Sequence, residues 1–282
     1  MLDILFYVLL FVVFGRIAFF AFKLAWGFTK VLFTLILLPF TLLFAVFSGL
    51  LSSAIATAMY PQMIELISLK KQEELNNLIV KIVNLFCVLM IPATFACFLF
   101  RTEMVAAVFQ RGAFDENSTT LTSNVFALYC IGLFFIACNT VLSNIFYGNG
   151  DTKTPMAISL ANLFINVVLN ILFIQSLGVN GLALATSLSA IVTFIIRILA
   201  SKKYIKLNLK KIGITGIKVL LATVVACFIP RIIFWRYPTN IYVILIVSAI
   251  IGAILYYALM KILKVQEIND LIGMFKKKLK KA

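Results

Sequence analysis

The chain has 282 residues, of which 63% are hydrophobic and only 12% are charged, and it contains no histidine. Its mean hydropathy of +1.10 excludes an ordinary soluble globular domain, in which about half of the residues are apolar. The formal net charge of +15 is compatible with a nucleic-acid-binding protein, but the positions of the cations along the chain indicate a membrane topology instead.

Residues 1–47 form a hydrophobic N-terminal segment rich in Phe and Leu. Arg16, Lys23 and Lys30 follow one another at intervals of seven residues. This spacing puts the three cations near one face of a helix, as in a helix that lies at a membrane surface.

From residue 61 onward, apolar runs of about 20 residues recur, each long enough to cross a hydrocarbon core about 30 Å thick. Only helices or a closed barrel satisfy every backbone hydrogen bond inside lipid, and the runs lack the alternating polar residues of barrel strands. The sequence therefore predicts an all-α fold, a polytopic transmembrane helix bundle. Six spans are expected, at residues 80–100, 121–147, 155–175, 180–200, 212–230 and 241–262.

The segments between these spans alternate between two sides of the membrane, and Lys and Arg are shared unequally between the sides. With charges near span ends assigned to the nearer side, eighteen fall on the side that includes the C-terminus and four on the other. Cytoplasmic loops carry the excess of positive charge. The C-terminus is therefore expected in the cytoplasm, and no nucleic-acid partner is expected.

Helix caps are expected on both sides of the membrane. Asp115 can cap the helix that follows it, with Glu116 in the first turn, where the helix dipole favours negative charge. Thr154 followed by Pro155 is typical of an N-cap and the first helical position. Residues 265–282 combine helical apolar spacing with five lysines, which predicts a basic amphipathic cytoplasmic tail lying on anionic membrane lipids.

Asparagines recur inside two of the spans. Asn162, Asn166 and Asn170 lie at i, i+4 and i+8 and form a stripe on one face of a helix, and Asn139 and Asn144 on the preceding span can face the same space. Polar residues in a bilayer are costly and often functional. These five are candidate substrate-binding residues in the wall of a headgroup cavity. The alternative is hydrogen bonding between helices, worth about 0.6 kcal/mol per bond.

The next span carries two further features. Gly181, Ala185 and Ser189 form a ridge of small residues four apart, which predicts close packing against another helix. Arg197, near the cytoplasmic end of this span, is expected to extend along the helix toward lipid phosphate.

No enzyme active site, cofactor or metal site is expected. The cysteines lie within apolar runs without a Cys-x-x-Cys pair, as small buried hydrophobes do. The acidic residues can all be placed outside the spans, and histidine is absent, so no catalytic constellation is indicated. The five cysteines are Cys87, Cys97, Cys130, Cys138 and Cys227.

Six short blocks carry a family resemblance: MYPQM (59–63), IPAT (91–94), FQRGAFD (109–115), FYGNGDTKTP (146–155), NVVLN (166–170) and GLALATSL (181–188). In order and spacing they resemble the C-terminal half of the MurJ (MviN) family of lipid II flippases, members of the multidrug/oligosaccharidyl-lipid/polysaccharide exporter superfamily. The resemblance implies one lobe of a two-lobe flippase fold in the bacterial plasma (inner) membrane. It further implies an undecaprenyl-linked precursor lipid as substrate, with its tail in a groove formed by the last two spans; their composition permits ordinary lipid contact equally.

The resemblance covers residues from about 48 to 282, so residues 48–264 are expected to form the C-terminal transmembrane lobe. Residues 1–47 do not match the family, and Leu42 stands where the family has an arginine. The resemblance implies that the family's first lobe is missing from this sequence, and a gene fusion or an artefact of gene calling or assembly is expected to explain the foreign segment.

Three functions follow as hypotheses. The first is a transmembrane lobe of a lipid II flippase, which is expected to be inactive without a separate N-terminal lobe. The second is a flippase for another polyprenyl-linked polysaccharide precursor. The third is a non-transporting membrane remnant or interaction protein.

Overall fold

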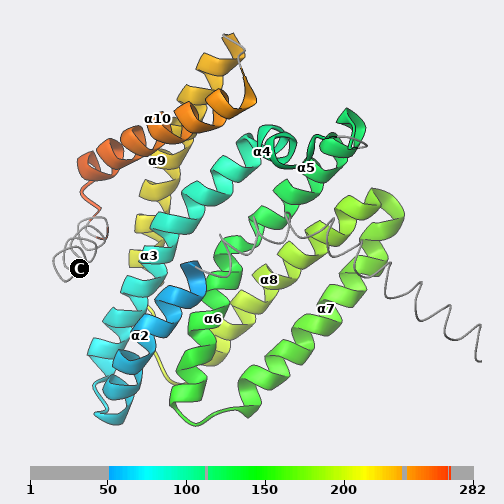
Figure 1. Cartoon of the computed structure of the whole chain (residues 1–282). Coiled ribbons are helices and arrows are strands. Elements are labelled where there is room, and N and C mark those ends of the chain that lie inside the picture. Colours follow the sequence, from blue (N-terminus) through cyan, green and yellow to red (C-terminus); the bar gives the residue numbers. More distant parts are fainter. Residues whose placement is uncertain (1–50, 112–113, 237–239, 266, 268–282) are drawn as a thin grey trace, which may run out of the picture. The chain divides into compact units, whose positions relative to one another are not determined.

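A computed structural model describes residues 51–111, 114–236, 240–265 and 267 of the chain (Figure 1). The predicted N-terminal segment 1–47 and most of the predicted tail 265–282 lie outside these residues. The described part contains helices and no strand. The helices are α2 (Leu51–Ser68), α3 (Gln72–Leu99), α4 (Arg101–Phe109), α5 (Glu116–Ile131), α6 (Leu133–Gly148), α7 (Lys153–Leu177), α8 (Val179–Ser201), α9 (Leu209–Arg236) and α10 (Ile241–Ile262).

Six stretches of the described chain are long and apolar enough to cross a membrane: α3, α5 together with α6, α7, α8, α9 and α10. Their number and order confirm the predicted all-α membrane bundle. The largest difference in the bounds is at the start of α3, which begins at Gln72 rather than near residue 80. Hydropathy marks the part of a helix that lipid surrounds, and α3 extends beyond that part.

The predicted span 121–147 consists of two helices that meet at Gly132. Ser187 of α8 donates a hydrogen bond to the carbonyl of Leu128 at 2.6 Å, just before the break. A Cβ atom on Gly132 would lie 3.0 Å from the Ser187 hydroxyl and 3.1 Å from the Ser187 Cα. The missing side chain of Gly132 therefore lets α8 approach the break closely enough to bond a carbonyl there.

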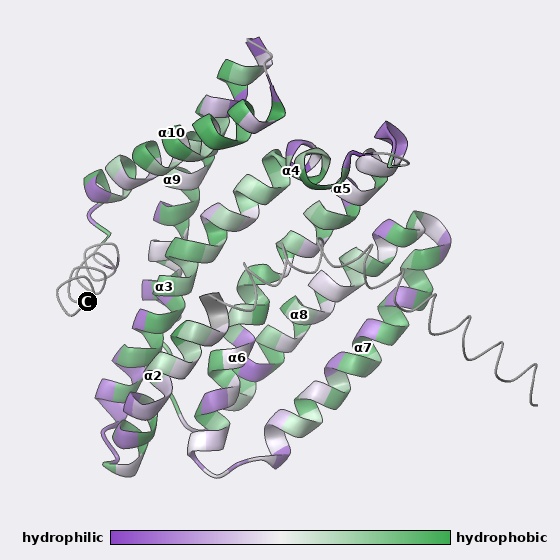
Figure 2. Ribbon diagram, in the orientation of Figure 1, coloured by the Kyte–Doolittle hydropathy of each residue, from purple (hydrophilic) through white to green (hydrophobic). Residues whose placement is uncertain are grey.

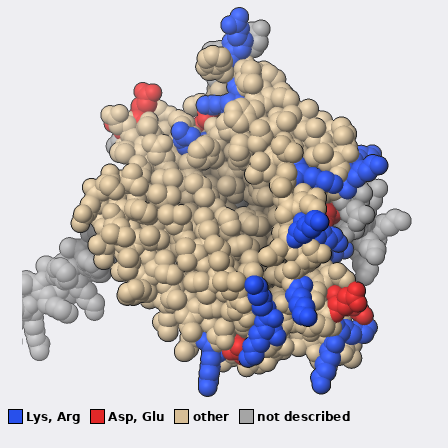
Figure 3. Space-filling model, turned by 180° about the vertical axis from the view of Figure 1, so that it is seen from behind, with Lys and Arg blue, Asp and Glu red and all other residues tan. Residues whose placement is uncertain are grey.

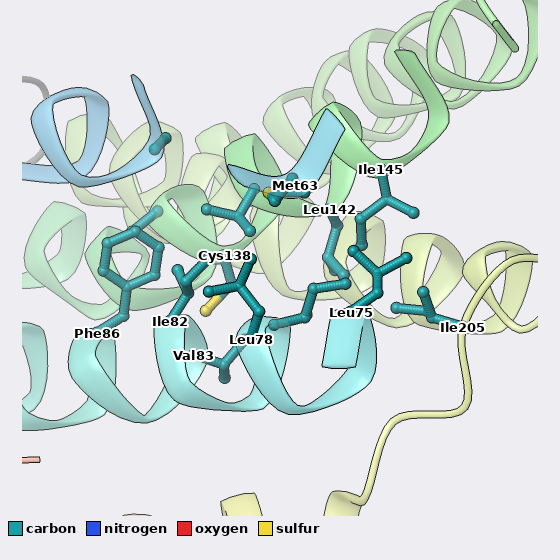
Figure 4. Close-up of a cluster of buried hydrophobic side chains, with 14 of the residues drawn as sticks. Met63, Leu75, Leu78, Ile82, Val83, Phe86, Cys138, Leu142, Ile145 and Ile205 are labelled. Atoms are coloured by element: carbon teal, nitrogen blue, oxygen red, sulfur yellow. The ribbon is translucent and has the colours of Figure 1, made fainter. Parts of the chain in front are cut away.

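The largest cluster of buried apolar side chains joins α2, α3 and α6 to the segment that follows α8 (Figure 4). Ile82 and Phe86 of α3, Leu142 of α6 and Met63 of α2 are each at most 1% exposed. Lipid is as apolar as these side chains, so close van der Waals contact holds such a cluster together within a bilayer.

Helix α9 packs against α3 and α10, and α10 also packs against α4, whereas α7 packs mainly along α8 (Figure 1). Val265, just after α10, belongs to a second buried cluster with Val88, Val219 and Met260. The start of the predicted tail is thus held against the bundle.

Helix α7 is the least covered of the six spans. Its long apolar side chains face outward, and Phe164 is 70% exposed. The outward faces of α7, α9 and α10 are predominantly apolar (Figure 2). Such exposure is typical of a helix surrounded by lipid, since a soluble protein would expose a large continuous apolar surface only at a binding site.

One of the two predicted caps is correct. Asp115 precedes α5 and accepts a hydrogen bond from the Ser118 backbone N–H at 2.8 Å, as predicted. The predicted cap at Thr154 is wrong, because α7 begins at Lys153. The carboxylate of Asp151 satisfies Thr154 instead, accepting from its backbone N–H at 3.0 Å and its hydroxyl at 2.7 Å.

The basic side chains are concentrated at one end of the described bundle. Figure 3 shows Lys and Arg along the lower and right-hand margins, with a broad uncharged surface between these and the few charges at the top. The basic end includes the α2–α3 turn with Lys70 and Lys71 and the α8–α9 segment with Lys202 and Lys203. The other end carries four arginines, Arg101, Arg111, Arg231 and Arg236.

Candidate functional site

Polar side chains of α6, α7 and α8 line a pocket of about 340 Å³, called the polar pocket here. It lies where α6 and α7 diverge, since α7 packs along α8 and hardly touches α6. Among its lining residues are Asn139, Ser143 and Asn144 of α6, Asn162 of α7, and Thr193 and Arg197 of α8.

The polar pocket includes three of the five predicted site residues, namely Asn139, Asn144 and Asn162. The other two lie farther along α7 and bond within or across the α7–α8 contact. Asn166 donates to the Ser189 hydroxyl at 3.2 Å, and Asn170 donates to the Asn166 side-chain oxygen at 3.0 Å. One asparagine stripe thus contributes both to a pocket wall and to a bond between helices.

The contacts between α7 and α8 form a regular series, called the polar ladder here. The Arg197 guanidinium donates to Ser159 at 3.2 Å, Thr193 donates to Asn162 at 2.7 Å, and Asn166 donates to Ser189. From one pair to the next, the residue number rises on α7 and falls on α8, because the two helices run antiparallel. Each side of the ladder repeats every three or four residues, which is the spacing of one helix face.

The predicted ridge of small residues on α8 lies against α7. Gly181 is buried, and a Cβ atom there would lie 2.5 Å from the backbone oxygen of Phe173. Ala185 and Ser189 are also buried. The prediction of a close packing surface is therefore confirmed, and Gly181 provides the closest approach.

The predicted position of Arg197 is wrong. Its side chain is only 8% exposed and points into the bundle, where it donates to the Asn139 backbone oxygen at 2.9 Å as well as to Ser159. The reason is the environment of α8, which packs against α5, α6 and α7. The Asn139 carbonyl of α6 and the Ser159 hydroxyl of α7 thus turn the side chain into the bundle rather than toward the surrounding bilayer.

A second pocket, of about 270 Å³, lies between α3, α4, α9 and α10 and is called the apolar pocket here. Phe100, Met104, Leu245 and Gly252 are among its lining residues. Thr223 and Ser248 also line it, and neither hydroxyl has a hydrogen-bond partner in the described residues. This pocket suits a hydrocarbon chain better than a polar group.

The basic end of the bundle is held by bonds between its connecting segments. Tyr204 donates to Asp151 at 3.0 Å, and Gln72 donates to the Tyr204 backbone oxygen. The backbone N–H of Lys206 donates to Asn76 at 3.0 Å. The hydrogen bonds from the Thr154 backbone and hydroxyl, and then that from Tyr204, hold the pKa of Asp151 below its ordinary value.

Comparison with known proteins matches residues 41–252 to the family model for lipid II flippase MurJ. A probable lipid II flippase MurJ of Rickettsia prowazekii is 33% identical over 139 residues, which is 49% of this chain and 27% of that protein. The corresponding protein of Thermotoga maritima is 26% identical over 184 residues, 65% of this chain and 37% of that protein. The chain belongs to the MurJ family.

A solved structure of lipid II flippase MurJ in an inward closed conformation has the same fold, with a TM-score of 0.65 and 21% identity. The match covers 83% of this chain and 46% of that one. This chain therefore spans between about a quarter and a half of the MurJ proteins that it matches. The family match includes α2 to α9 and ends within α10, so it contains the polar pocket and the whole polar ladder.

Sequence reasoning on this MurJ-family chain missed the α8 half of the polar ladder. Ser189, Thr193 and Arg197 lie at i, i+4 and i+8, the same spacing that identified the asparagine stripe on α7. The equal spacing of the polar residues on α7 and α8 is a signal in the sequence that could have predicted two polar stripes facing each other. The basic character of Arg197 instead favoured a headgroup contact, because the sequence gives the depth of a residue in the membrane but not the face of the helix that its neighbours cover.

Proposed function

We propose that this polypeptide is a transmembrane lobe of a lipid II flippase, and that the polar pocket forms part of the path of the substrate headgroup. The observation that carries the proposal is the polar pocket itself, in which amide, hydroxyl and guanidinium groups from three transmembrane helices lie together. Polar groups are costly inside a bilayer and are concentrated where a polar substrate passes. Membership of the MurJ family supports lipid II as that substrate.

The two pockets match the two parts of an undecaprenyl-linked precursor. The sugar and diphosphate carry many hydrogen-bonding groups, for which Asn139, Asn144 and Asn162 offer amide donors and acceptors. The polyprenyl tail needs only an apolar surface, which the apolar pocket beside α9 and α10 provides. Asn166 and Asn170 lie beyond the pocket, and their proposed role is to hold α7 against α8 where the headgroup passes.

The basic end of the bundle is proposed to face the cytoplasm of a bacterium, with the chain in the plasma membrane. The unequal distribution of Lys and Arg supports this orientation. In this orientation the C-terminal residues lie on the inner leaflet, where anionic lipids attract lysines with about 1 kcal/mol each.

Transport by this lobe is proposed to need an opposing lobe, because alternating access requires one bundle to rock against another around a central site. The coverage of 46% of a solved relative is consistent with one of two such bundles. The opposing lobe can come from further polypeptide of the same gene product or from a separate chain. The proposed activity moves a lipid and makes or breaks no covalent bond.

Complementation of a bacterium depleted of its own MurJ tests the proposal. The chain produced together with a MurJ N-terminal lobe is expected to restore growth, and the chain alone is expected not to. Asn162→Leu, which keeps a similar side-chain volume but removes the amide from the polar pocket, is expected to reduce rescue. Leu163→Asn on the outward face of α7 serves as the control for membrane insertion.

The outcomes separate the competing functions. Rescue of a surface-polysaccharide flippase mutant, without rescue of the MurJ-depleted strain, would favour another polyprenyl-linked substrate. No rescue of either strain by the paired lobes, with both lobes present in the membrane, would contradict transport and favour a membrane interaction protein.

A further inference from the structure

Arg197 carries a buried charge that no carboxylate neutralises among the described residues. Both of its hydrogen bonds go to neutral oxygens, the Asn139 backbone carbonyl and the Ser159 hydroxyl. A guanidinium stays protonated in proteins, so the positive charge remains. A buried charge without a counter-charge is costly, and Arg197 is the only charged side chain among the described residues that line the polar pocket.

The hydrogen-bonding capacity of the polar pocket is only partly used. A guanidinium has five N–H donors, and the Arg197 Nε has no partner within the described part of the chain. The side-chain oxygen of Asn139, which also lines the pocket, is buried and has no partner among the residues that the structure describes. No hydrogen bond joins the Asn144 side chain to another described residue. A ligand here would gain both donors and an acceptor.

The depth of Arg197 in the bundle further restricts the ligand. Arg197 lies one turn from the end of α8 at Ser201, about 6 Å along the helix axis. Tyr147, which also lines the pocket, is followed by the last residue of α6. The pocket is therefore near the basic end of the bundle rather than at the middle of the spans.

From these observations we infer that the polar pocket binds the phosphoryl group of a lipid, with Arg197 as its cation and Asn144 beside it. A guanidinium can bond two phosphate oxygens at once, and the pairing neutralises the buried charge. The unpaired Asn139 oxygen suits a hydroxyl next to the phosphoryl group. The inference rests on the proposed function for its orientation and names Arg197 as a substrate-positioning residue in this lobe.

A lipid in the inner leaflet can reach this site without moving its tail out of the hydrocarbon. Its phosphoryl group already lies at the depth of Arg197, and the pocket is situated where α6 and α7 diverge. Occupation of the polar pocket would thus be an early step that precedes movement of the headgroup toward the opposite leaflet.

Binding to the purified full-length chain tests the inference directly. The protein is kept in maltoside detergent, which contains no phosphate, and is titrated calorimetrically with a polyprenyl diphosphate. The matching polyprenol, which lacks the phosphoryl groups, is the ligand control. Wild-type protein is expected to bind the diphosphate, and Arg197→Gln is expected to bind it at least about tenfold more weakly, the effect of losing hydrogen bonds to a charged group.

Two further variants make the test independent of folding effects at Arg197. Asn144→Asp keeps Arg197 and its bonds but places a negative charge in the polar pocket, and it is expected to weaken diphosphate binding by a similar factor. Lys210→Gln removes a cation from the first turn of α9 at the same end of the protein and is expected to change binding by less than about twofold. Size-exclusion elution of each variant reports whether it is folded.

Competition identifies the source of the phosphoryl group. Displacement by inorganic pyrophosphate would support recognition of the phosphoryl group itself, and displacement by phosphatidylglycerol would support the site and assign it to ordinary phospholipid. Polyprenol binding as tight as diphosphate binding, or wild-type affinity in both Asn144→Asp and folded Arg197→Gln, would overturn the inference. Complementation can still succeed in that case, so failure here is distinguishable from failure of the proposed function.

Discussion

The α7–α8 pair and the α9–α10 pair are both antiparallel transmembrane hairpins, but they are held together differently. The polar ladder runs through the interior of the α7–α8 contact, with side-chain hydrogen bonds such as Thr193 to Asn162 at 2.7 Å. The α9–α10 pair packs through apolar side chains beside the apolar pocket. Lys218 of α9 donates a hydrogen bond to the backbone oxygen of Leu263, which caps the end of α10, at 3.1 Å.

This difference indicates separate roles for the two hairpins. Hydrogen bonds between helices fix a register, because each donor needs its acceptor at the same level. Apolar contacts allow small changes of register, since one methyl group can replace another. A precise polar pocket therefore suits the α6–α8 region, and a surface that adapts to a flexible hydrocarbon chain suits α9 and α10.

The largest expected effect comes from separating α7 from α8. In Gly181→Ala, the added Cβ would lie 2.5 Å from the Phe173 oxygen and 2.7 Å from its carbonyl carbon. Both are backbone atoms, so α8 must move away from α7. A loss of about 3 kcal/mol or more in unfolding free energy is expected from such overpacking, measured as a large fall in the thermal unfolding midpoint in detergent.

The control for this substitution is Gly216→Ala on α9. Nothing lies within 4 Å of a Cβ atom built there, and alanine is the better helix former by about 1 kcal/mol. Gly216→Ala is expected to leave stability unchanged or to raise it slightly. Equal destabilisation by the two substitutions would remove the contrast between the close α7–α8 contact and α9.

The contrast between the hairpins was only partly predictable. Hydropathy located all six spans, because burial in lipid depends on composition alone. The asparagine stripe on α7 was also visible, since it follows from helical geometry. The partner of that stripe could not be predicted, because the same spacing is compatible with a contact with α8, with a cavity or with another lobe.

The break at Gly132 was unpredictable for a related reason. A single glycine within an apolar run is common in transmembrane helices, so its presence alone does not indicate an interruption. The break is stabilised by Ser187, which is 55 residues away in sequence and reaches the Leu128 carbonyl from α8. Likewise, the burial of Arg197 depends on Asn139 and Ser159, which lie on two other helices.

A moderate effect is expected from the ion pair that joins the α9–α10 pair to α4. Glu103 and Arg231 form this pair, and their side chains are 16% and 40% exposed. Partial exposure to water weakens the attraction, so Glu103→Gln is expected to cost about 1 kcal/mol. Hydrogen exchange should rise near Arg231 at the end of α9 and stay unchanged along α8.

An exchanged pair provides the control. Glu103→Arg combined with Arg231→Glu restores opposite charges at the same positions, and exchange near residue 231 is expected to return toward the wild-type rate. Increased exchange along α8 in Glu103→Gln would contradict the view that the two hairpins are held independently.

The smallest expected effect concerns Asp151 at the basic end, where the segment before α7 contacts the segment between α8 and α9. Tyr204 binds Asp151 beside α7, while Gln72 of α3 binds the Tyr204 backbone. A carboxylate with a lowered pKa stabilises the folded state at pH values above its ordinary pKa of 3.8 and loses this contribution as the pH falls through the lowered value.

Asp151→Asn should therefore unfold at a lower temperature than wild type at pH 7, with the difference vanishing as the pH falls below about 4. Asp115→Asn, which keeps a side-chain acceptor for the cap of α5 but removes its charge at the opposite end, should give a similar pH dependence, because the pKa of Asp115 is lowered by its bond from Ser118. Only Asp151→Asn is expected to raise hydrogen exchange in residues 202–208, and equal exchange there in both variants would mean that the Tyr204 contact does not hold the segment between α8 and α9.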